Sequence, residues 1–298
     1  MTGVVDVGGG LRDIFGAGVF DYCLGRGIRF DYCIGVSAGS ANIASYLGGQ
    51  SGRNYKFYTE YAFRRRYMSL GNFIRTGSYI NMDYAYGELS KKGGESPLDF
   101  GRIKSSASVM KVVAMNALTG ETVYFDKSDM CQDDYSILMA SSSIPVVCRP
   151  YSVRGVPYFD GGLADPVPVR RAFGSGCDKV VVILTKPRDF VRSQESDLRL
   201  VRLLRRRYPK SAEQLLLRYK KYNDGVALAK KCEEEGRALI LAPEDTFGMR
   251  TLTKSRETLD RMYRMGVGAA AALDNFLGLP ERSGQAAAKI RPGPVASV

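Results

Sequence analysis

The sequence predicts an α/β protein: a three-layer α/β/α arrangement around a mostly parallel central sheet, followed by a C-terminal helical extension. Two observations support this prediction. Over the first 185 residues, short β-prone runs alternate with segments whose apolar residues recur at helical spacing, a pattern that places helices on both faces of a sheet. The run 108–115, SVMKVVAM, is almost continuously apolar, as expected of a parallel strand buried on both faces.

The elements are expected in the following order. Strands are predicted near residues 2–7, 30–34, 108–117, 121–125, 156–159 and 179–185, and helices near 13–25, 38–48, 53–63 and 133–142. From residue 186 the pattern changes. Amphipathic helices are predicted at 198–207 and 212–235, a short strand at 238–242 that joins the sheet at an edge, and a long final helix at 252–276. The predicted organisation is a core over 1–185, an extension packed on it over 186–279, and a disordered tail over 280–298.

The most informative motif is Gly35-Val36-Ser37-Ala38-Gly39, which stands between an expected strand and an expected helix. A serine between two glycines at a strand-to-helix turn is the arrangement of a nucleophile elbow. The glycines allow a sharp turn, which lifts the serine hydroxyl out of the sheet. The motif therefore predicts that Ser37 is a nucleophile.

The chain contains no histidine. A Ser-His-Asp triad needs an imidazole as its base, so this chain alone cannot form one. A nucleophilic Ser37 must instead pass its proton to a carboxylate, a lysine or a histidine of a partner chain. Asp160 is a candidate because it ends a short aromatic strand and is followed by Gly161 and Gly162. The same three residues also fit a plain turn in which the aspartate bonds its own backbone.

A glycine loop, Gly8-Gly9-Gly10-Leu11-Arg12, connects the N-terminal strand to the next helix. Such a loop directs backbone N–H groups toward an anion, and an oxyanion hole uses the same arrangement. A dinucleotide-binding loop is the competing interpretation. Asp13 argues against it, since it stands where the third glycine of the dinucleotide motif would be.

Together these motifs resemble those of the patatin-like phospholipase family, and the chain looks most similar to its small bacterial members. The matching segments are Gly8–Arg12, Gly35–Gly39, Ala140-Ser-Ser-Ser-Ile-Pro145 and Asp160–Gly162, in the family's order and spacing, and the resemblance covers about residues 1–185. It implies the patatin-like fold and a serine acyl-ester hydrolase of the phospholipase A or lysophospholipase kind. No histidine, cofactor or metal ion is implied.

The resemblance also assigns roles to residues of this sequence. It implies that Ser37 is the nucleophile and Asp160 the general base of a Ser-Asp dyad. It implies an oxyanion hole formed by Gly9, Gly10, Leu11 and Arg12. The other motif residues that support the match are Gly8, Gly35, Ala38, Gly39, Gly161 and Gly162.

The sequence departs from the family's pattern near the glycine loop. The family usually has glycine after the arginine, where this chain has Asp13, and often an acidic residue before the glycines, where this chain has Val7 and, one place earlier, Asp6. The Asp13 carboxylate would oppose an oxyanion, or it would sit favourably at a helix N-terminus. A lipid- or acyl-binding protein with little turnover is therefore the alternative function. The pKa of Asp160 is left open, since burial would raise it and Arg12 would lower it.

The net charge is +12, from 43 Lys and Arg against 31 Asp and Glu. Two basic blocks, 64–66 and 202–207, fit either solvated helix faces or contact with an anionic partner. No nucleic-acid-binding motif accompanies the charge, so an anionic membrane surface is favoured and a nucleic-acid-associated protein is the third interpretation.

No apolar run approaches the length of about 18 residues needed to span a membrane, and no signal peptide is visible. Six scattered cysteines without a Cys-x-x-Cys pair suggest free thiols. We expect a cytoplasmic protein in peripheral contact with a membrane.

The segment 53–97, rich in Tyr, Phe, Gly and Arg, is expected to form either ordinary core or a lid or acyl-chain channel over Ser37.

Overall fold

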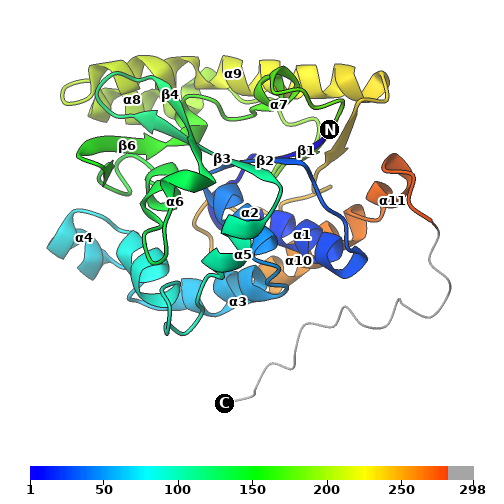
Figure 1. Cartoon of the computed structure of the whole chain (residues 1–298). Helices are drawn as coiled ribbons and strands as arrows, with labels where there is room; N and C mark the ends of the chain where they lie inside the picture. Colours follow the sequence, from blue (N-terminus) through cyan, green and yellow to red (C-terminus); the bar gives the residue numbers. More distant parts are fainter. Residues whose placement is uncertain (281–298) are drawn as a thin grey trace.

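A single eight-stranded sheet forms the middle layer of the protein, seen here in a computed structural model that describes residues 1–280 (Figure 1). The strand order is β5-β6-β3-β2-β1-β7-β8, and β4 pairs with β3 outside this path. The pairs from β3 to β8 along this order are parallel, whereas β4, β5 and β6 pair antiparallel. The mostly parallel sheet predicted from the sequence is thus confirmed. The strands are β1 (Thr2–Asp6), β2 (Tyr32–Val36), β3 (Val109–Asn116), β4 (Thr122–Asp126), β5 (Tyr151–Val153), β6 (Val156–Asp160), β7 (Lys179–Ile183) and β8 (Ala238–Leu241).

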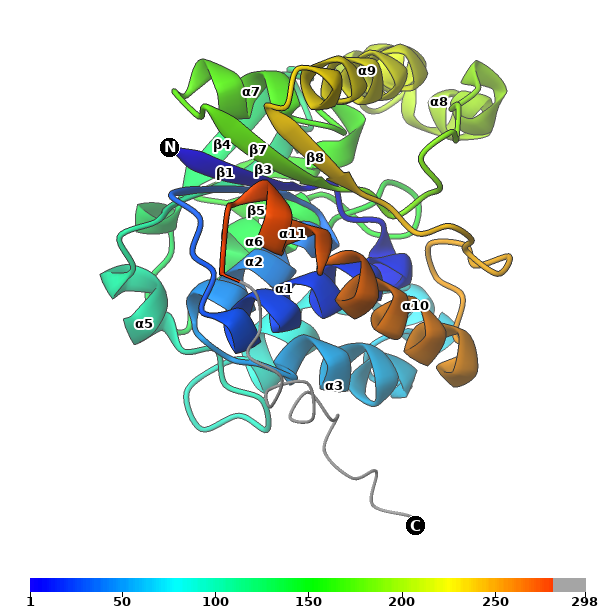
Figure 2. The ribbon, with the colours of Figure 1, turned by 90° about the vertical axis from the view of Figure 1, so that its right-hand side faces the viewer.

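Helices cover both faces of the sheet (Figures 1 and 2). One face carries α7 (Val169–Gly174), α8 (Leu198–Leu204) and α9 (Pro209–Glu234). The other carries α1 (Ile14–Arg26), α2 (Ala38–Leu47), α3 (Arg53–Thr59), α5 (Phe100–Ser105), α6 (Ser136–Ser141) and α10 (Arg256–Ala269). The remaining α-helices of the described residues are α4 (Leu70–Thr76) and α11 (Ala272–Phe276), and a π-helical segment spans Asp83–Leu89. Short 3-10 helices lie at Gly10–Asp13, Tyr61–Phe63, Lys127–Asp129, Gly161–Leu163 and Gln194–Asp197. This is the predicted three-layer arrangement.

The strand register brings distant segments to one edge of the sheet. Asp6 at the end of β1 pairs with Gly35 near the end of β2, so the glycine loop and the elbow leave the sheet side by side. Val36 pairs with Val113 of β3, and the next residue of β3, Ala114, pairs with Asp160. Pairing to the same strand therefore places the elbow next to the end of β6.

The final helix differs from its prediction. Instead of one helix over 252–276, the chain forms α10 and α11 with a break near Ala270 and Ala271. The N-terminal boundary of α10 is set by Ser255, whose side chain accepts a hydrogen bond from the backbone N–H of Thr258. Residue 252 and its neighbours consequently form a loop. The strand expected at 238–242 is β8, which pairs with β7 at the sheet edge.

The described residues contain no helix that combines the length and apolar character needed to cross a bilayer. All six cysteines are free, and Cys131 alone among them is exposed. The predicted tail, 280–298, lies outside the described residues from residue 281 onward.

Candidate active site

Ser37 occupies the turn between β2 and α2, with φ 56° and ψ −127°. This backbone conformation is costly for any residue other than glycine. The flanking glycines are required by close contacts, because a Cβ on Gly35 would lie 2.5 Å from the backbone of Ser40, and one on Gly39 would lie 2.5 Å from the carbonyl oxygen of Asp6. The motif therefore folds as a nucleophile elbow.

Asp160, at the end of β6, is buried, and the Ser37 hydroxyl is positioned to donate to its carboxyl. Its Oδ1 also accepts the backbone N–H of Gly162 at 2.7 Å. Burial raises the pKa of Asp160 above its usual value, and the Ser37 hydroxyl, the Gly162 bond and the charge of Arg218 reduce that rise. The cation that lowers this pKa thus comes from α9, whereas the sequence had suggested Arg12.

The last residue of α6 and the segment that follows it hold both of these residues. The Ser37 backbone N–H donates to Ser141 Oγ at 2.8 Å, and that hydroxyl donates to the carbonyl of Val113 at 2.6 Å. The backbone N–H of Asp160 donates to the carbonyl of Ser143 at 3.0 Å. Sequence reasoning had matched this segment to a family but had given it no role. Its role is to position the elbow and the aspartate relative to β3.

The glycine loop runs beside the elbow in a conformation that only glycine adopts readily. The φ angles of Gly8, Gly9 and Gly10 are 66°, 144° and 62°. Among the described residues, nothing accepts a hydrogen bond from the N–H of Gly9 or Gly10. The Leu11 N–H, by contrast, donates to the carbonyl of Thr251 at 2.8 Å. Of the residues expected to form the oxyanion hole, Gly9 and Gly10 have backbone N–H groups available to an anion, whereas the Leu11 N–H is bonded within the protein.

Arg12 anchors the loop to the C-terminal half. Its Nε donates to the Thr185 carbonyl at 3.3 Å and its Nη1 to Thr251 Oγ1 at 3.4 Å. Neither threonine was identified from the sequence, since Thr251 was placed next to a predicted helix and Thr185 at a strand end. The loop is therefore held from the residues that follow β7 and from the segment before α10.

Asp13 faces a second buried carboxyl, Asp6. Both side chains are fully buried, and a Cβ on Gly16 would lie 2.7 Å from Asp13 Oδ1 and 2.8 Å from Asp6 Oδ2. Asn42 Nδ2 donates to the Asp13 carbonyl at 2.9 Å and to Asp6 Oδ2 at 3.4 Å. No N–H or O–H group of the described residues reaches the Asp13 carboxyl, so its hydrogen-bonding partner is the Asp6 carboxyl itself.

Two carboxyl groups this close share a proton, because both cannot be charged at low cost. Burial, followed by the charge of Asp6, raises the pKa of Asp13 well above its usual value, and burial raises the pKa of Asp6 to about 6. Asp13 is the N-cap residue of α1, but its side chain makes no capping bond. Asp13 thus stands at the helix N-terminus, as expected, but does not cap it through its side chain. A raised pKa favours the neutral form of Asp13, which carries no negative charge to oppose an oxyanion.

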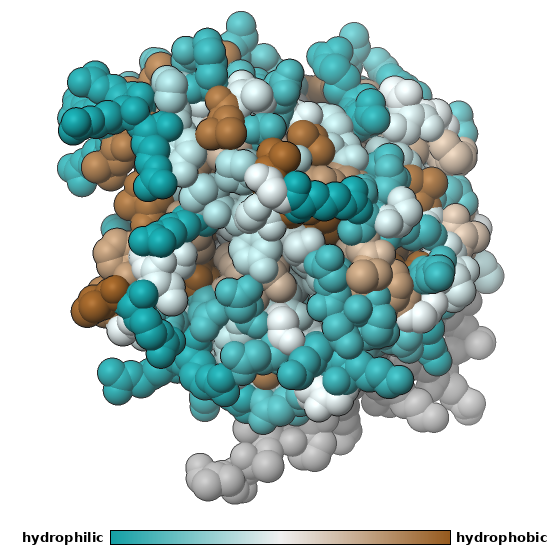
Figure 3. Space-filling view, turned by 60° about the vertical axis from the view of Figure 1, so that its left-hand side comes forward, coloured by the Kyte–Doolittle hydropathy of each residue, from teal (hydrophilic) through white to brown (hydrophobic). Residues whose placement is uncertain are grey.

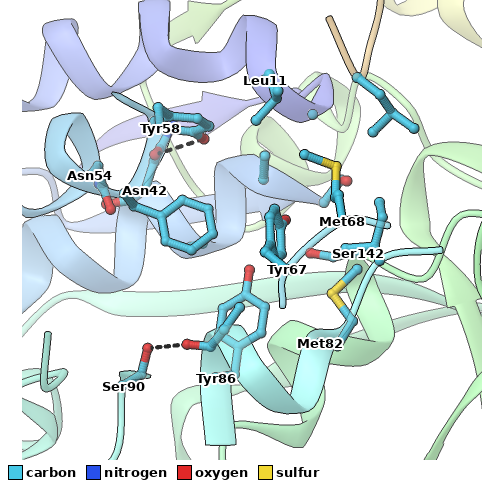
Figure 4. Close-up of a pocket in the computed structure, with 18 of the residues that line it drawn as sticks. Leu11, Asn42, Asn54, Tyr58, Tyr67, Met68, Met82, Tyr86, Ser90 and Ser142 are labelled. Atoms are coloured by element: carbon cyan, nitrogen blue, oxygen red, sulfur yellow. Dashed lines mark hydrogen bonds between the residues drawn. The ribbon is translucent and has the colours of Figure 1, made fainter. Parts of the chain in front are cut away.

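An apolar cavity opens at Ser37, with about 690 Å³ of free volume including space open to solvent. Figure 4 shows Tyr67, Met68, Met82 and Tyr86 converging on it from the segment between α3 and α5. The aromatic segment 53–97 therefore supplies a cavity wall as well as core. The other lining residues include Leu11, Ala38, Ala41, Phe57, Tyr58, Ile80, Ile144 and Leu252.

A second, larger cavity meets the first at Ser37, with about 1200 Å³ of free volume including space open to solvent. Asp160, the glycine loop and Arg12 line it. Much of the rest of its wall comes from residues between β7 and α10, where the sequence had indicated no site.

Comparison with known proteins agrees with this geometry. The sequence model of the patatin-like phospholipase family matches residues 7–173, and a domain of unknown function, DUF6363, matches residues 208–274. The uncharacterized protein YjjU of Escherichia coli K12 is 31% identical in an alignment over 198 residues, and the match covers 60% of this chain and 50% of YjjU. The chain thus spans about half the length of this curated relative.

Among solved structures, VipD from Legionella pneumophila aligns with a TM-score of 0.48 and 14% identity, over 92% of this chain and 66% of that one. The family match covers more than half of the chain and includes the elbow, the glycine loop and the Asp160 motif. This chain belongs to the patatin-like phospholipase family.

Proposed function

We propose that this protein hydrolyses acyl esters of lipids with Ser37 as nucleophile and Asp160 as general base. The observation that carries the proposal is the placement of the Ser37 hydroxyl beside the buried Asp160 carboxyl in one cavity wall, at an elbow that also borders an apolar cavity. Because the chain has no histidine, a carboxylate acting directly on the serine is the simplest route for its proton.

The reaction has two halves. Asp160 accepts the Ser37 proton as Oγ bonds to the ester carbonyl carbon, and the N–H groups of Gly9 and Gly10 stabilise the oxyanion. The bond to the alcohol then breaks, and the alcohol leaves with the proton held by Asp160. In the second half Asp160 takes a proton from water, hydroxide attacks the acyl-serine, and Ser37 recovers its hydrogen as the fatty acid leaves.

Two features support this assignment of roles. The raised pKa of Asp160 makes it a stronger base than an exposed aspartate, which suits proton transfer near neutral pH. The apolar cavity beside Ser37 suits the acyl chain of a lipid, because its walls are aromatic and aliphatic.

The test compares wild type with Ser37→Ala and Asp160→Asn on p-nitrophenyl hexanoate. We expect Ser37→Ala to reduce hydrolysis to background and Asp160→Asn to reduce kcat by about 10²- to 10⁴-fold. A fluorophosphonate probe should label wild type and not Ser37→Ala. Ser105→Ala, an exposed serine on α5, serves as the matched control and should keep full activity.

Equal rates in wild type and Ser37→Ala would exclude the proposed nucleophile. If wild type bound fatty acid with no turnover and no probe labelling, the protein would be an acyl-binding member of the family.

A further inference from the structure

An arginine from the C-terminal part of the chain lies beside the reaction centre. Arg218 belongs to α9, outside the patatin-like match at residues 7–173 and inside the DUF6363 match at residues 208–274. It lines the larger cavity together with Ser37 and Asp160. Its side chain is 27% exposed, whereas its Nε is buried. A residue of the DUF6363 segment thus forms part of the wall that holds the proposed nucleophile and base.

The guanidinium group of Arg218 and the carboxyl of Asp160 meet at Gly162. A Cβ on Gly162 would lie 3.0 Å from Asp160 Oδ1 and 3.7 Å from Arg218 Nη2. The bare Cα of this glycine therefore borders both groups, and a side chain at residue 162 would press against both. Opposite charges at such a separation attract each other strongly where water is scarce. The absence of a side chain at residue 162 leaves this attraction unobstructed.

The described part of the chain gives Arg218 only one weak ion pair. Its Nη1 lies 3.5 Å from Asp197. Arg192 binds the same carboxylate more closely, with Nη2 at 2.8 Å from one oxygen and 2.9 Å from the other. Arg218 Nε has no hydrogen-bond partner within residues 1–280. Asp197 therefore anchors Arg218 without neutralising it fully, and the charge of Arg218 can act on Asp160.

The other titratable side chains that face Asp160 in the described residues are neutral near pH 7. Burial raises the pKa of the Cys148 thiol to about 12, and burial also raises the pKa of Tyr86. The charge of Asp160 contributes to both increases. Ser37 contributes a neutral hydroxyl. The balance between the charged and the protonated form of Asp160 thus depends on its burial and on nearby cations.

Arg218 is the cation of the cavity wall that acts on Asp160. Burial raises the pKa of Asp160, and the charge of Arg218 opposes that increase. The other cations that line the cavity, Arg12, Lys186 and Arg192, have no comparable effect on this carboxyl. A general base must be ionised to accept a proton, and burial without a cation favours the protonated form.

We propose that Arg218 is a positioning residue for the reaction: its charge, anchored by Asp197, keeps the buried Asp160 carboxyl ionised and able to accept the Ser37 proton. This inference rests on the proposed acyl-ester hydrolysis for its reaction, and on the placement of Arg218 against Gly162 for its charge. It gives the DUF6363 segment a part in preparing the base.

The first experiment measures kcat/KM for p-nitrophenyl hexanoate as a function of pH. In wild type we expect activity to rise with pH along an acid limb that reports the ionisation of Asp160. Arg218→Gln should move this limb to higher pH by about 1 unit or more, because the carboxylate loses an opposite charge. Above the limb, the variant should recover kcat/KM to within severalfold of wild type. Arg218→Lys keeps the charge and should keep the limb in place.

A merely structural role of Arg218 would lower kcat/KM at every pH without moving the limb, and that result would overturn the proposal. Arg218→Met keeps an apolar stem and removes the same charge, so it replaces Arg218→Gln if the glutamine variant does not fold. The matched control is Lys186→Gln, which removes one positive charge from the same cavity and should leave the limb in place. A shift of equal size in Lys186→Gln would overturn the assignment to Arg218.

The second experiment observes the Asp160 carboxyl directly by NMR in the Ser37→Ala protein, so that it stands apart from turnover. Aspartate is isotopically labelled at the carboxyl carbon, and adding Asp160→Asn identifies the resonance. Adding Arg218→Gln instead should move the titration midpoint of this resonance to higher pH, and an unmoved midpoint would overturn the proposal. A moved midpoint without any Ser37-dependent hydrolysis in wild type would sustain the action of Arg218 on Asp160 and exclude the proposed function instead.

Discussion

At the scale of single residues, the Asp6 and Asp13 pair is the most unusual feature of the site. Both carboxyls are buried behind the glycine loop, and Gly8 N–H donates to Asp6 Oδ1 at 3.1 Å. The pair therefore supports the glycine loop while sharing one proton between its two carboxyls. In the unfolded chain the same carboxyls would lose that proton at a lower pH. A carboxyl with a raised pKa in the folded state makes stability fall as pH rises from its unfolded value, near 4, toward its folded value.

We predict that Asp13→Asn stabilises the protein at pH 8 more than at pH 5. The introduced amide donates a hydrogen bond to Asp6 and carries no titrating proton. The free energy of unfolding of wild type falls by about 1.4 kcal/mol per pH unit as the pair loses its proton, and this fall should be absent in the variant. The difference in Tm, measured by calorimetry, should widen from pH 5 to pH 8. Asp224→Asn, an exposed aspartate, should show no such widening. A Tm difference that does not change with pH would contradict proton sharing.

The sequence located Ser37 and Asp160 because their signals are local, a serine or an aspartate with glycines beside it. It could not locate Arg218, because one arginine in an amphipathic helix resembles every other. The burial of Asp13 was equally hidden, since it depends on a strand and a helix that meet only in the fold.

At the scale of elements, α4 stands out because its apolar side chains face solvent. Leu70 is 72% exposed and Ile74 is 85% exposed, with Phe73 between them at 45%. Figure 3 shows the molecule from the side on which α4 lies in Figure 1, and brown apolar residues stand among teal ones on this face. Tyr67 and Met68, just before α4, line the apolar cavity. The exposed helix therefore lies at the rim of the cavity that we assign to the acyl chain.

We predict that α4 enters the surface of an anionic membrane, with Arg65 and Arg75 beside it contacting the headgroups. Ile74→Asp should weaken co-sedimentation with phosphatidylglycerol-containing vesicles about tenfold or more, since a buried isoleucine contributes about 1.5–3 kcal/mol. Binding should also fall at high salt.

The matched control is Leu203→Asp on α8, an exposed apolar residue within the second basic block. Unchanged binding in that variant would assign the contact to α4. Loss in Leu203→Asp with none in Ile74→Asp would move the contact to α8 and refute the prediction.

Secondary structure was predictable where hydrophobic periodicity and strand composition agree, as in β3 and α2. It failed at 252–276, where a helical pattern runs continuously through the sequence, but Ser255 caps a helix that starts later. The consequence was functional, because Thr251 and Leu252 then line the cavities at Ser37.

At the scale of the whole molecule, the C-terminal part is joined to the core by an unusually close helix crossing. A Cβ on Gly18 of α1 would lie 2.3 Å from the Tyr263 carbonyl oxygen, and one on Gly266 of α10 would lie 2.0 Å from that of Phe15. Figure 2 shows α1 and α10 side by side beneath the sheet. Since α1 begins where the glycine loop ends, this crossing links the C-terminal helices to the loop.

We predict opposite effects from two neighbouring substitutions in α10. Gly266→Ala forces the helices apart and should destabilise the protein by about 1–3 kcal/mol. Gly268→Ala meets open space and should be neutral or stabilising by up to about 1 kcal/mol, because alanine favours the helix. Urea unfolding of both variants checks this. Equal stability of the two would show that α10 does not pack as closely as described.

The backbone of Ser37 has a consequence for how this sequence can evolve. Its φ of 56° with ψ of −127° costs a serine about 1–3 kcal/mol that glycine would not lose. Selection for stability alone would therefore replace this serine by glycine. A lineage that abandoned the reaction would be free to make that change, so the serine persists only while descendants benefit from its hydroxyl group.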